Sequence, residues 1–224
     1  MNSKNHILVT RCSYIIMLLI FTFGFAKAGV LDPLETDEIE KVKQIQLAYI
    51  RENLPQVLTD SAIEIEVLLV ERHSVKKGEE NNVARLADIY TYDYGANILH
   101  QAVVSLETNS VLSLTQNTEV QLPLTENEIQ KAVDILKADE EQFKSILQEY
   151  KRITGQEYSN ADQIEIKAFA FWGNSLPGVS NAESLKCGVY RCAQLLIYTP
   201  DQVAFEVSPV VNISTKKVTQ NINF

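Results

Sequence analysis

Apolar side chains recur every three or four positions from Thr36 to Asn53, and this spacing predicts an amphipathic helix. The apolar positions of the stripe are Ile39, Val42, Ile45, Tyr49 and Ile50. Asp37 and Glu38 fall in the first turn, where acidic side chains interact favourably with the helix dipole. We therefore expect one helix that buries a single face.

A second helical pattern begins after Leu122-Pro123-Leu124. Thr125 and Glu128 have the Thr-x-x-Glu spacing of a capping box, in which each side chain satisfies a backbone N–H at the helix start. The apolar positions that follow are Ile129, Val133, Leu136, Phe143, Ile146, Leu147 and Tyr150. The polar stretch 137–140 interrupts them, so we expect the helix to break or bend there before it ends near Gly155.

Other segments show the two-residue period of β-strands. Ile63 to Glu71 begins with alternating Ile and Glu and then becomes wholly apolar, which predicts a strand whose later part is covered on both faces. Ile164 to Trp172 repeats that pattern. Each of the longer runs Arg85–Val111 and Arg191–Val218 predicts a hairpin, and Asp93–Asn97 supplies a Gly/Asn turn in the first one.

Most of these patterns occur twice, so the chain contains an internal repeat. The helix starts match at an offset of 90 and the first strands at an offset of 101. The hairpins match at an offset of 106 before the turn and 107 after it, through Arg85/Arg191, Ala87/Ala193, Tyr92/Tyr198, Val103/Val210, Val104/Val211, Thr108/Thr215 and Val111/Val218. A repeat of this length indicates two copies of one structural unit.

Each copy reads as a helix followed by three strands, with a short fourth strand left open. An amphipathic helix of this kind buries its apolar stripe against a curved antiparallel sheet. The sequence therefore predicts an α+β protein with two tandem rolls, at residues 29–118 and 119–224. The connection near 117–122 is short and has no Gly/Ser-rich stretch, so we expect the two domains to touch.

The first 28 residues read as a secretory signal peptide. Lys4 and Arg11 precede an apolar run of 12 residues, 14–25, and Ala26-Lys27-Ala28 has small residues at the cleavage positions. A membrane anchor is the alternative, but a spanning helix needs about 20 apolar residues. We expect cleavage after Ala28 and a periplasmic or secreted protein that has no membrane association after cleavage.

The charge of the expected mature chain is strongly acidic. Residues 29–224 carry 17 basic and 29 acidic side chains. Such a chain is a poor candidate for binding nucleic acid or an anionic membrane surface. We therefore look for a protein partner or a small ligand instead.

Cys187 and Cys192 are the only cysteines of the expected mature chain, and an exported compartment is oxidising. Two cysteines provide too few donors for a structural zinc site, and their spacing differs from the Cys-x-x-Cys of redox motifs. We predict a disulfide between them. Bridging requires a turn, which Gly188 can supply.

Tyr90, Tyr92 and Tyr94 alternate along one predicted strand, so their side chains share a face. This row is either a surface for contact with a partner or, in the interpretation we favour, a cover for the helix or the neighbouring domain. The mature chain contains two histidines, His73 and His100, which lack the ligand spacing of a metal site. Asn212-Ile-Ser214 is a glycosylation sequon, which has meaning only in a eukaryotic secretory pathway.

Four stretches of the sequence carry a family resemblance: DPLETDEI, LADIYTYDY, AVVSLETNSV and LPLTENEIQKAV. They resemble the small N-terminal domains of copper amine oxidases, which carry a Pro-Leu-Thr-x-x-Glu-Ile helix start and a Val-Val-Asp-Leu-Thr-Thr-Gly-Lys-Val strand. The resemblance implies a tandem pair of cystatin-like domains. It covers nearly all of the expected mature chain, but Asn109 and Lys216 stand near the place of the usual glycine.

The catalytic features of that family are not found in this sequence. The oxidases make a quinone cofactor from the Tyr of an Asn-Tyr-Asp/Glu motif, and no Asn-Tyr pair occurs here. They bind copper through three histidines, whereas the expected mature chain has two. The large catalytic sandwich of the family would have to follow Phe224. We therefore expect no cofactor, no bound metal and no catalysis by this chain alone.

Three functions stay open at this stage. The first is an exported, non-catalytic binding or interaction protein that uses a sheet face or the cleft between its domains. The second is an accessory subunit or remnant of an amine oxidase that acts with a separate catalytic chain. The third is a cystatin-like protease inhibitor, because Gln101–Ser105 faintly resembles the Gln-x-Val-x-Gly loop of those inhibitors. Ser105 replaces the glycine, and the segment lies in a predicted strand, which disfavours the third.

Overall fold

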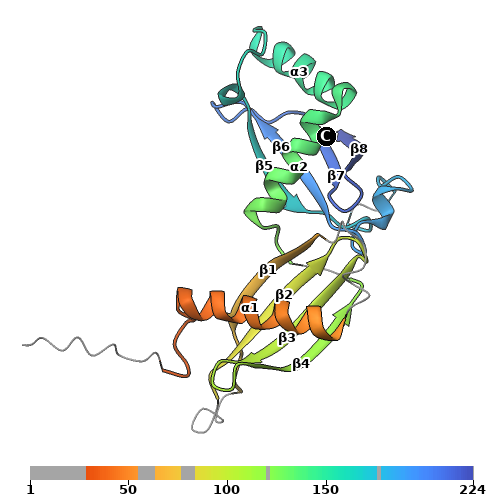
Figure 1. The fold of residues 1–224 in the computed structure, drawn as a ribbon. Helices are drawn as coiled ribbons and strands as arrows, with labels where there is room; N and C mark the ends of the chain where they lie inside the picture. Colours follow the sequence, from red (N-terminus) through yellow and green to blue (C-terminus); the bar gives the residue numbers. More distant parts are fainter. Residues whose placement is uncertain (1–28, 55–63, 77–83, 120–121, 176–177, 224) are drawn as a thin grey trace, which may run out of the picture.

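The computed structural model describes residues 29–54, 64–76, 84–119, 122–175 and 178–223. The expected signal peptide, 1–28, lies outside the described residues. The described chain forms two α+β units that follow one another along the sequence (Figure 1). Within this part of the chain, no helix is both long and apolar enough to cross a bilayer.

In the first unit, one helix packs on a four-stranded antiparallel sheet. The helix is α1 (Thr36–Asn53), with the bounds that the sequence predicts. The strands are β1 (Ile65–Arg72), β2 (Leu86–Asp93), β3 (Ile98–Ser105) and β4 (Ser110–Asn117), in the sheet order β1-β2-β3-β4. The fourth strand, expected to be short, has the same length as the others because it pairs with β3 from Leu99 to Ser105.

The second unit repeats the arrangement with an interrupted helix. Its helices are α2 (Glu126–Ala138) and α3 (Glu140–Thr154), and its strands are β5 (Glu165–Ala170), β6 (Cys192–Tyr198), β7 (Val207–Asn212) and β8 (Lys217–Asn223). The sheet order is β5-β6-β7-β8, again antiparallel. The sequence repeat is therefore a repeat of the fold.

Local chemistry explains where the helices of the second unit begin and end. The capping box is present: Glu128 N–H donates to Thr125 Oγ1 (3.0 Å), and Thr125 N–H donates to Glu128 Oε2 (2.9 Å). Asp139 ends α2 and also caps α3, where it accepts a hydrogen bond from Gln142 N–H (3.1 Å). This confirms the predicted break, and Figure 1 shows α3 turning away from the direction of α2. Gly155 ends α3 with a left-handed φ of 71°, which glycine adopts without strain.

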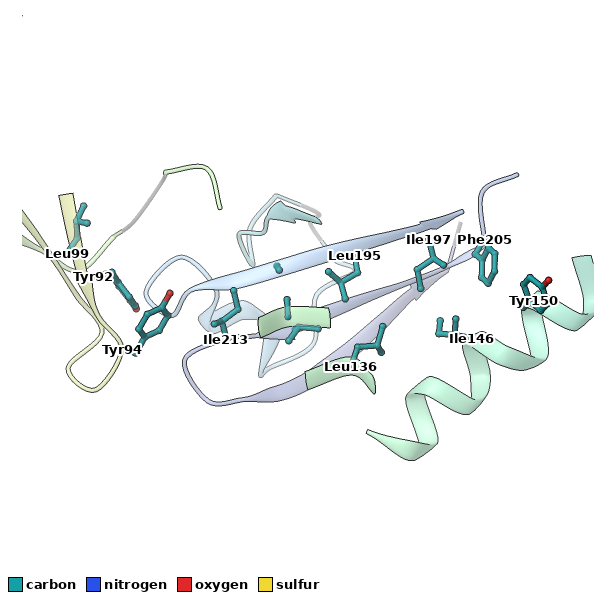
Figure 2. Packing of buried hydrophobic residues seen from close by; sticks show 13 residues of the cluster. Tyr92, Tyr94, Leu99, Leu136, Ile146, Tyr150, Leu195, Ile197, Phe205 and Ile213 are labelled. Atoms are coloured by element: carbon teal, nitrogen blue, oxygen red, sulfur yellow. The ribbon is translucent and has the colours of Figure 1, made fainter. Parts of the chain in front are cut away.

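Two hydrophobic clusters form the main core. One lies between α1 and the first sheet and contains Val42, Ala87, Ile89, Ala102, Val104 and Leu106. The other joins the two units: Tyr92, Tyr94 and Leu99 of the first pack in one continuous cluster with side chains of the second, among them Leu136, Leu195, Ile197 and Ile213 (Figure 2). The domains are therefore in contact, as the short connection predicts.

Candidate functional site

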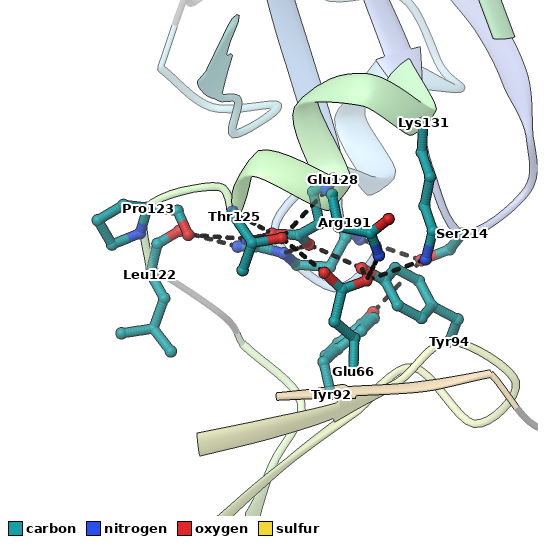
Figure 3. Close-up of polar contacts among 11 residues, drawn as sticks. Glu66, Tyr92, Tyr94, Leu122, Pro123, Thr125, Glu128, Lys131, Arg191 and Ser214 are labelled. Carbon is teal, nitrogen blue, oxygen red and sulfur yellow. Dashed lines mark hydrogen bonds and ion pairs between the residues drawn. The ribbon is translucent and has the colours of Figure 1, made fainter. Parts of the chain in front are cut away.

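A buried ion pair lies at the start of α2. Arg191 Nε and Nη2 donate to the two carboxylate oxygens of Glu128, each at 2.7 Å. The guanidinium also donates to the backbone carbonyls of Leu122 (2.9 Å) and Pro123 (3.1 Å) (Figure 3). The Glu128 and Arg191 side chains are 0% and 2% exposed. Paired donors and acceptors of this kind compensate for the cost of burying both charges.

The first domain contains the equivalent pair. Arg85 Nε and Nη2 donate to Glu38 at 3.0 and 2.6 Å. The Arg85 guanidinium also donates to the carbonyls of Asp32 (2.6 Å) and Pro33 (2.8 Å), which correspond to Leu122 and Pro123 at the offset of 90. The arginine in each copy therefore joins its sheet to the chain segment that enters its helix.

Sequence reasoning did not find these pairs. Arg85 and Arg191 are matched in the repeat, and so are the first-turn acids Glu38 and Glu128. Each arginine lies 47 or 63 residues from its glutamate, so local periodicity does not connect them. The available signal was that an arginine and a glutamate, of opposite charge, are both retained at equivalent positions of the two copies.

A polar network connects the two domains around Glu66 of β1. Its carboxylate accepts hydrogen bonds from Thr125 Oγ1 (2.6 Å), Asn127 Nδ2 (2.8 Å) and Lys131 Nζ (2.9 Å) (Figure 3). Lys131 also pairs with Glu64. Three side chains of the second domain thus converge on one carboxylate of the first, which holds the start of α2 against β1.

The same network shifts the pKa of its members. Burial opposes ionisation of Glu66, but the hydrogen bonds from Thr125 and Lys131 outweigh it and lower the pKa of that carboxyl. Burial likewise opposes the charge of Lys131, yet its bonds to Glu64 and Glu66 raise its pKa. Both groups are charged at neutral pH, so they form a lasting electrostatic contact between the domains.

The tyrosine row is part of this junction. Tyr94 Oη donates to Glu128 Oε1 (2.9 Å), and Tyr92 Oη donates to the carbonyl of Val189 (3.0 Å). The Tyr92 and Tyr94 residues are 0% and 7% exposed, and Tyr90 packs at the edge of the same cluster. Burial, followed by the charges of Glu128 and Glu66, raises the pKa of Tyr94, so its hydroxyl stays protonated and acts as a donor.

The second domain covers the tyrosine row of β2. Tyr92 and Tyr94 were candidates for a free contact surface, but the second domain covers them, so they are not available to a separate partner. At the junction, where a cleft was expected from the sequence, these rings and the Glu66 network connect the two domains. The row faces away from α1, because Ile89 and its neighbours on the other face of β2 pack against that helix.

The two histidines lie apart in different surroundings. His73 Nδ1 is 2.8 Å from Asp88 Oδ1 at the end of β1, and its side chain is 35% exposed. His100 is fully buried in β3, and neither ring nitrogen has a hydrogen-bond partner among the residues that the structure describes. Burial lowers the pKa of His100 despite the nearby charge of Asp93, so the ring is neutral at pH 7.

Copper of the amine-oxidase type does not fit these residues. That site needs three histidines, and among the described residues no three His, Cys, Asp or Glu side chains gather closely enough to hold a metal ion. His73 and His100 have separate surroundings.

The structure contains the predicted disulfide between Cys187 and Cys192, with their Cα atoms 5.6 Å apart. Gly188 has the positive φ (115°) that the tight turn requires. The disulfide packs with Phe171, Val210 and Ile222 in a small third cluster. The disulfide therefore fixes the loop before β6 against the second sheet.

The inhibitor-like segment and the glycosylation sequon both lie in buried parts of the fold. Gln101–Ser105 lies inside the central strand β3, and Val104 and Ser105 are 0% and 3% exposed. A segment in that position cannot enter a protease cleft as an inhibitory loop does. Asn212 of the sequon is 2% exposed, and its side chain caps the turn by accepting a hydrogen bond from Thr215 N–H (2.9 Å).

Each domain carries a surface groove between its helix and its last hairpin. In the second domain a groove of about 750 Å³ is lined by Asp134, Ile135, Ala138, Asp139, Glu140, Lys216, Lys217 and Val218. In the first, a groove of about 470 Å³ is lined by Gln44, Ile45, Ala48, Tyr49, Glu52, Asn109, Ser110 and Val111. Seven of these eight positions correspond in the repeat, so the groove is a property of the shared fold. Only the second groove carries opposite charges on its two walls.

Comparisons with known proteins match only at the level of fold. No protein-family model and no curated protein match the sequence. Among solved structures, the chain is similar to a copper-containing benzylamine oxidase from Hansenula polymorpha, with a TM-score of 0.58 and 14% sequence identity. The match covers 88% of this chain but 30% of the oxidase chain. This chain therefore has the fold of a part of a copper amine oxidase.

Proposed function

We propose that this chain is an exported, non-catalytic binding or interaction protein built from domains of the kind found at the N-terminus of copper amine oxidases. The fold similarity supports the origin of the domains, and the four sequence stretches quoted above agree with it. Export rests on the signal-peptide pattern of residues 1–28 and agrees with the disulfide.

One observation carries the non-catalytic part of the proposal. The charged groups at the domain junction are already paired within the chain: the buried Glu128 with Arg191, and the half-buried Glu66 with Lys131. A catalytic acid or base needs a pKa near the working pH and access to a substrate. Glu66 has a lowered pKa and Lys131 a raised one, so both remain in their ordinary charged states. These groups hold the domains together.

The second-domain groove is the surface we assign to binding. Asp134 and Asp139 lie on its helix wall, and Lys217 lies on the opposite hairpin wall beside Lys216, which also pairs with Glu64 of the first domain (3.4 Å). A ligand or peptide that carries both signs of charge would satisfy both walls. The first-domain groove has Asn109 and Ser110 in place of the two lysines, so it serves as an internal control for binding by the second-domain groove.

The catalytic test uses the purified chain with copper added. We expect no quinone absorbance and no peroxide production from amines, because the copper-binding histidine set of the oxidases does not fit this chain. Copper-dependent turnover of an amine would refute the non-catalytic assignment. A benzylamine oxidase assayed in parallel shows that the conditions support the reaction.

The binding test places a photo-crosslinking residue at Lys217 and, as the matched control, at its repeat equivalent Ser110. Both variants are incubated with the exported protein fraction of the source cells. Cross-linked products are expected from the second-domain groove and not from the first. Equal labelling at both positions, or labelling only at Ser110, would contradict the assignment.

An accessory role beside a separate catalytic chain is the second candidate. It is favoured by one finding, that 88% of this chain matches 30% of an amine oxidase. In that case the cross-linked partner should itself oxidise amines. A partner without oxidase activity would refute the accessory role and would remain consistent with a general interaction role.

A further inference from the structure

The segment that enters the first domain wraps around the Arg85 guanidinium. Arg85 Nη1 donates to the carbonyls of Gly29 (2.7 Å), Val30 (3.2 Å) and Asp32 (2.6 Å), while Nη2 donates to Pro33. The Arg85 side chain is only 8% exposed because this strap covers it. Residues 29–33 are therefore an integral part of the first domain.

The first residue of the strap has a partner for its nitrogen. Gly29 N lies 2.6 Å from Asp32 Oδ2, and the turn is closed by Asp32 N–H, which donates to the Gly29 carbonyl (3.1 Å). A Cβ at position 29 would meet Asp32 Oδ2 at 3.0 Å, so glycine suits this approach. Gly29 is also the residue that would become the N-terminus if a peptidase cut after Ala28.

The charges around this nitrogen favour a cation. The adjoining groove is lined by Asp37, Glu38 and Glu107, opposite Lys41 and Arg85. Asp32 and Glu35 add two further carboxylates, whose charges join the hydrogen bond of Glu38, the main cause, in raising the pKa of Arg85. Five carboxylates thus stand against two cations, and Glu38 is already committed to Arg85.

We propose that Asp32 is a binding site for the N-terminal ammonium of the processed chain. In the uncut precursor, the Gly29 nitrogen is an amide that donates one hydrogen bond. Hydrolysis of the Ala28–Gly29 peptide bond consumes one water and leaves a carboxylate on the released peptide and an ammonium on Gly29. The Asp32 contact then becomes an ion pair, which strengthens the strap over Arg85. This inference rests on the proposed export.

The pH dependence of the effect has a definite sign. A free α-amino group has a pKa of about 7.7–8.0. A carboxylate partner raises that pKa in the folded state, so the added stability is present below the unfolded value and disappears as the pH rises through the folded value. The processed chain should therefore gain its advantage at pH 6 and lose it at pH 10.

The direct test measures the pKa of the Gly29 ammonium in a chain that begins at Gly29. Labelling with [2-13C]glycine allows the N-terminal methylene carbon to be followed during a pH titration. We expect a pKa roughly 0.5–1 unit above the ordinary value in the wild type and an ordinary value in Asp32→Asn. Asp37→Asn, which removes a groove carboxylate that has no contact with Gly29, should keep most of the shift. An equal pKa in the wild type and Asp32→Asn overturns the proposal.

A second measurement covers the case in which Asp32→Asn is less stable for other reasons. A chain extended by Ala28 keeps an amide at Gly29 and moves the ammonium away. Its melting temperature should be about 1–3 °C lower than that of the processed chain at pH 6, and equal at pH 10. Equal melting temperatures at pH 6 would overturn the binding site. N-terminal sequencing of the exported protein tests separately whether cleavage occurs after Ala28. A start other than Gly29 would refute that cleavage but would not change the titration result for a chain that begins at Gly29.

Discussion

Beneath α1 the first domain buries Gln46, Thr91 and His100, whereas beneath α2 the second domain has Leu136, Ile197 and Val207 at the equivalent positions. The equivalence is supported by pairing: His100 lies opposite Gln116 in β4, and Val207 lies opposite Asn223 in β8. Thr91 donates a hydrogen bond to Gln46, but within the described part of the chain Gln46 Nε2 and both nitrogens of His100 have no hydrogen-bond partner. At these three positions the first domain is polar and the second is apolar, although both domains have a hydrophobic cluster.

The arginine–glutamate pairs also differ between the domains, but here the second domain is the one that buries the charged groups more completely. Glu128 is fully buried, while the side chain of its counterpart Glu38 is 21% exposed. The reason is the junction, since Tyr94 of the first domain donates to Glu128 and helps to cover it, whereas Glu38 borders an open groove. We therefore expect the stability of the second domain to depend strongly on its ion pair, and the stability of the first domain to depend more on the strap, residues 29–33.

The largest effect should come from removing the buried arginine. Arg191→Met leaves Glu128 buried without its charged partner, so we expect a loss of about 3–5 kcal/mol in the free energy of unfolding. Arg85→Met should cost about 1–2 kcal/mol, because water can reach Glu38. Urea unfolding followed by circular dichroism measures both variants. Losses of equal size would show that the difference in burial has no energetic consequence.

The second largest effect should come from the disulfide, which only the second domain has, because the first domain of the expected mature chain contains no cysteine. Replacing Cys187 and Cys192 together with alanine should cost about 2 kcal/mol for so short a loop. Trp172, the single tryptophan, precedes the loop, and its fluorescence should report the loss. Adding a reductant to the wild type should reproduce the change, and an unchanged tryptophan transition would contradict it.

The buried histidine should make the first domain sensitive to acid. Burial lowers the pKa of His100 in the folded state, so below about pH 6.5 the unfolded chain binds a proton that the folded chain does not. Stability should fall by up to about 1.4 kcal/mol per pH unit until the folded pKa is reached. His100→Val copies Val207 of the second domain and should remove this part of the pH dependence. Parallel stability curves for the wild type and His100→Val would contradict this, and His73→Gln is the control for the exposed histidine.

The smallest difference concerns two matched tyrosines. Tyr92→Phe loses the hydrogen bond to the Val189 carbonyl across the junction and should cost about 0.5–1.5 kcal/mol. Tyr198→Phe changes the equivalent residue, whose ring lies against Lys167 within the second domain, and should cost less than about 0.5 kcal/mol. Thermal unfolding of both variants tests the order. A larger loss for Tyr198→Phe would mean that the row does not couple the domains.

The fold was predictable because its signals are local and occur twice. The α1 stripe, the capping box at Thr125, the break at Asp139 and the hairpins are all encoded within about 20 residues, and each appears as expected. The length of β4 was underestimated, because its polar, partly exposed sequence lacks a clear alternation and pairing with β3 decides the outcome.

The junction was less predictable because its contacts join distant parts of the chain. Three tyrosines on one face indicated a covered surface, but nothing local to β2 identifies the second domain as the cover. The Glu66 partners lie about 60 residues away, in a helix whose own pattern is already explained by its core face. The polar interior around His100 was hidden for a related reason, since a buried histidine is not distinguishable by spacing from an exposed one.

The position of Tyr92 and Tyr94 also sets an order for assembly during synthesis. The first sheet is complete at Asn117, before Glu128 and Val189, the partners of these tyrosines, have been made. Domains generally fold as units, starting from the N-terminus. A nascent first domain therefore presents two bare aromatic rings, which the second domain covers only when the loop before β6 has emerged. Until then this face is open to association with other unfinished chains, so the chain's vulnerable period is the synthesis of its second half.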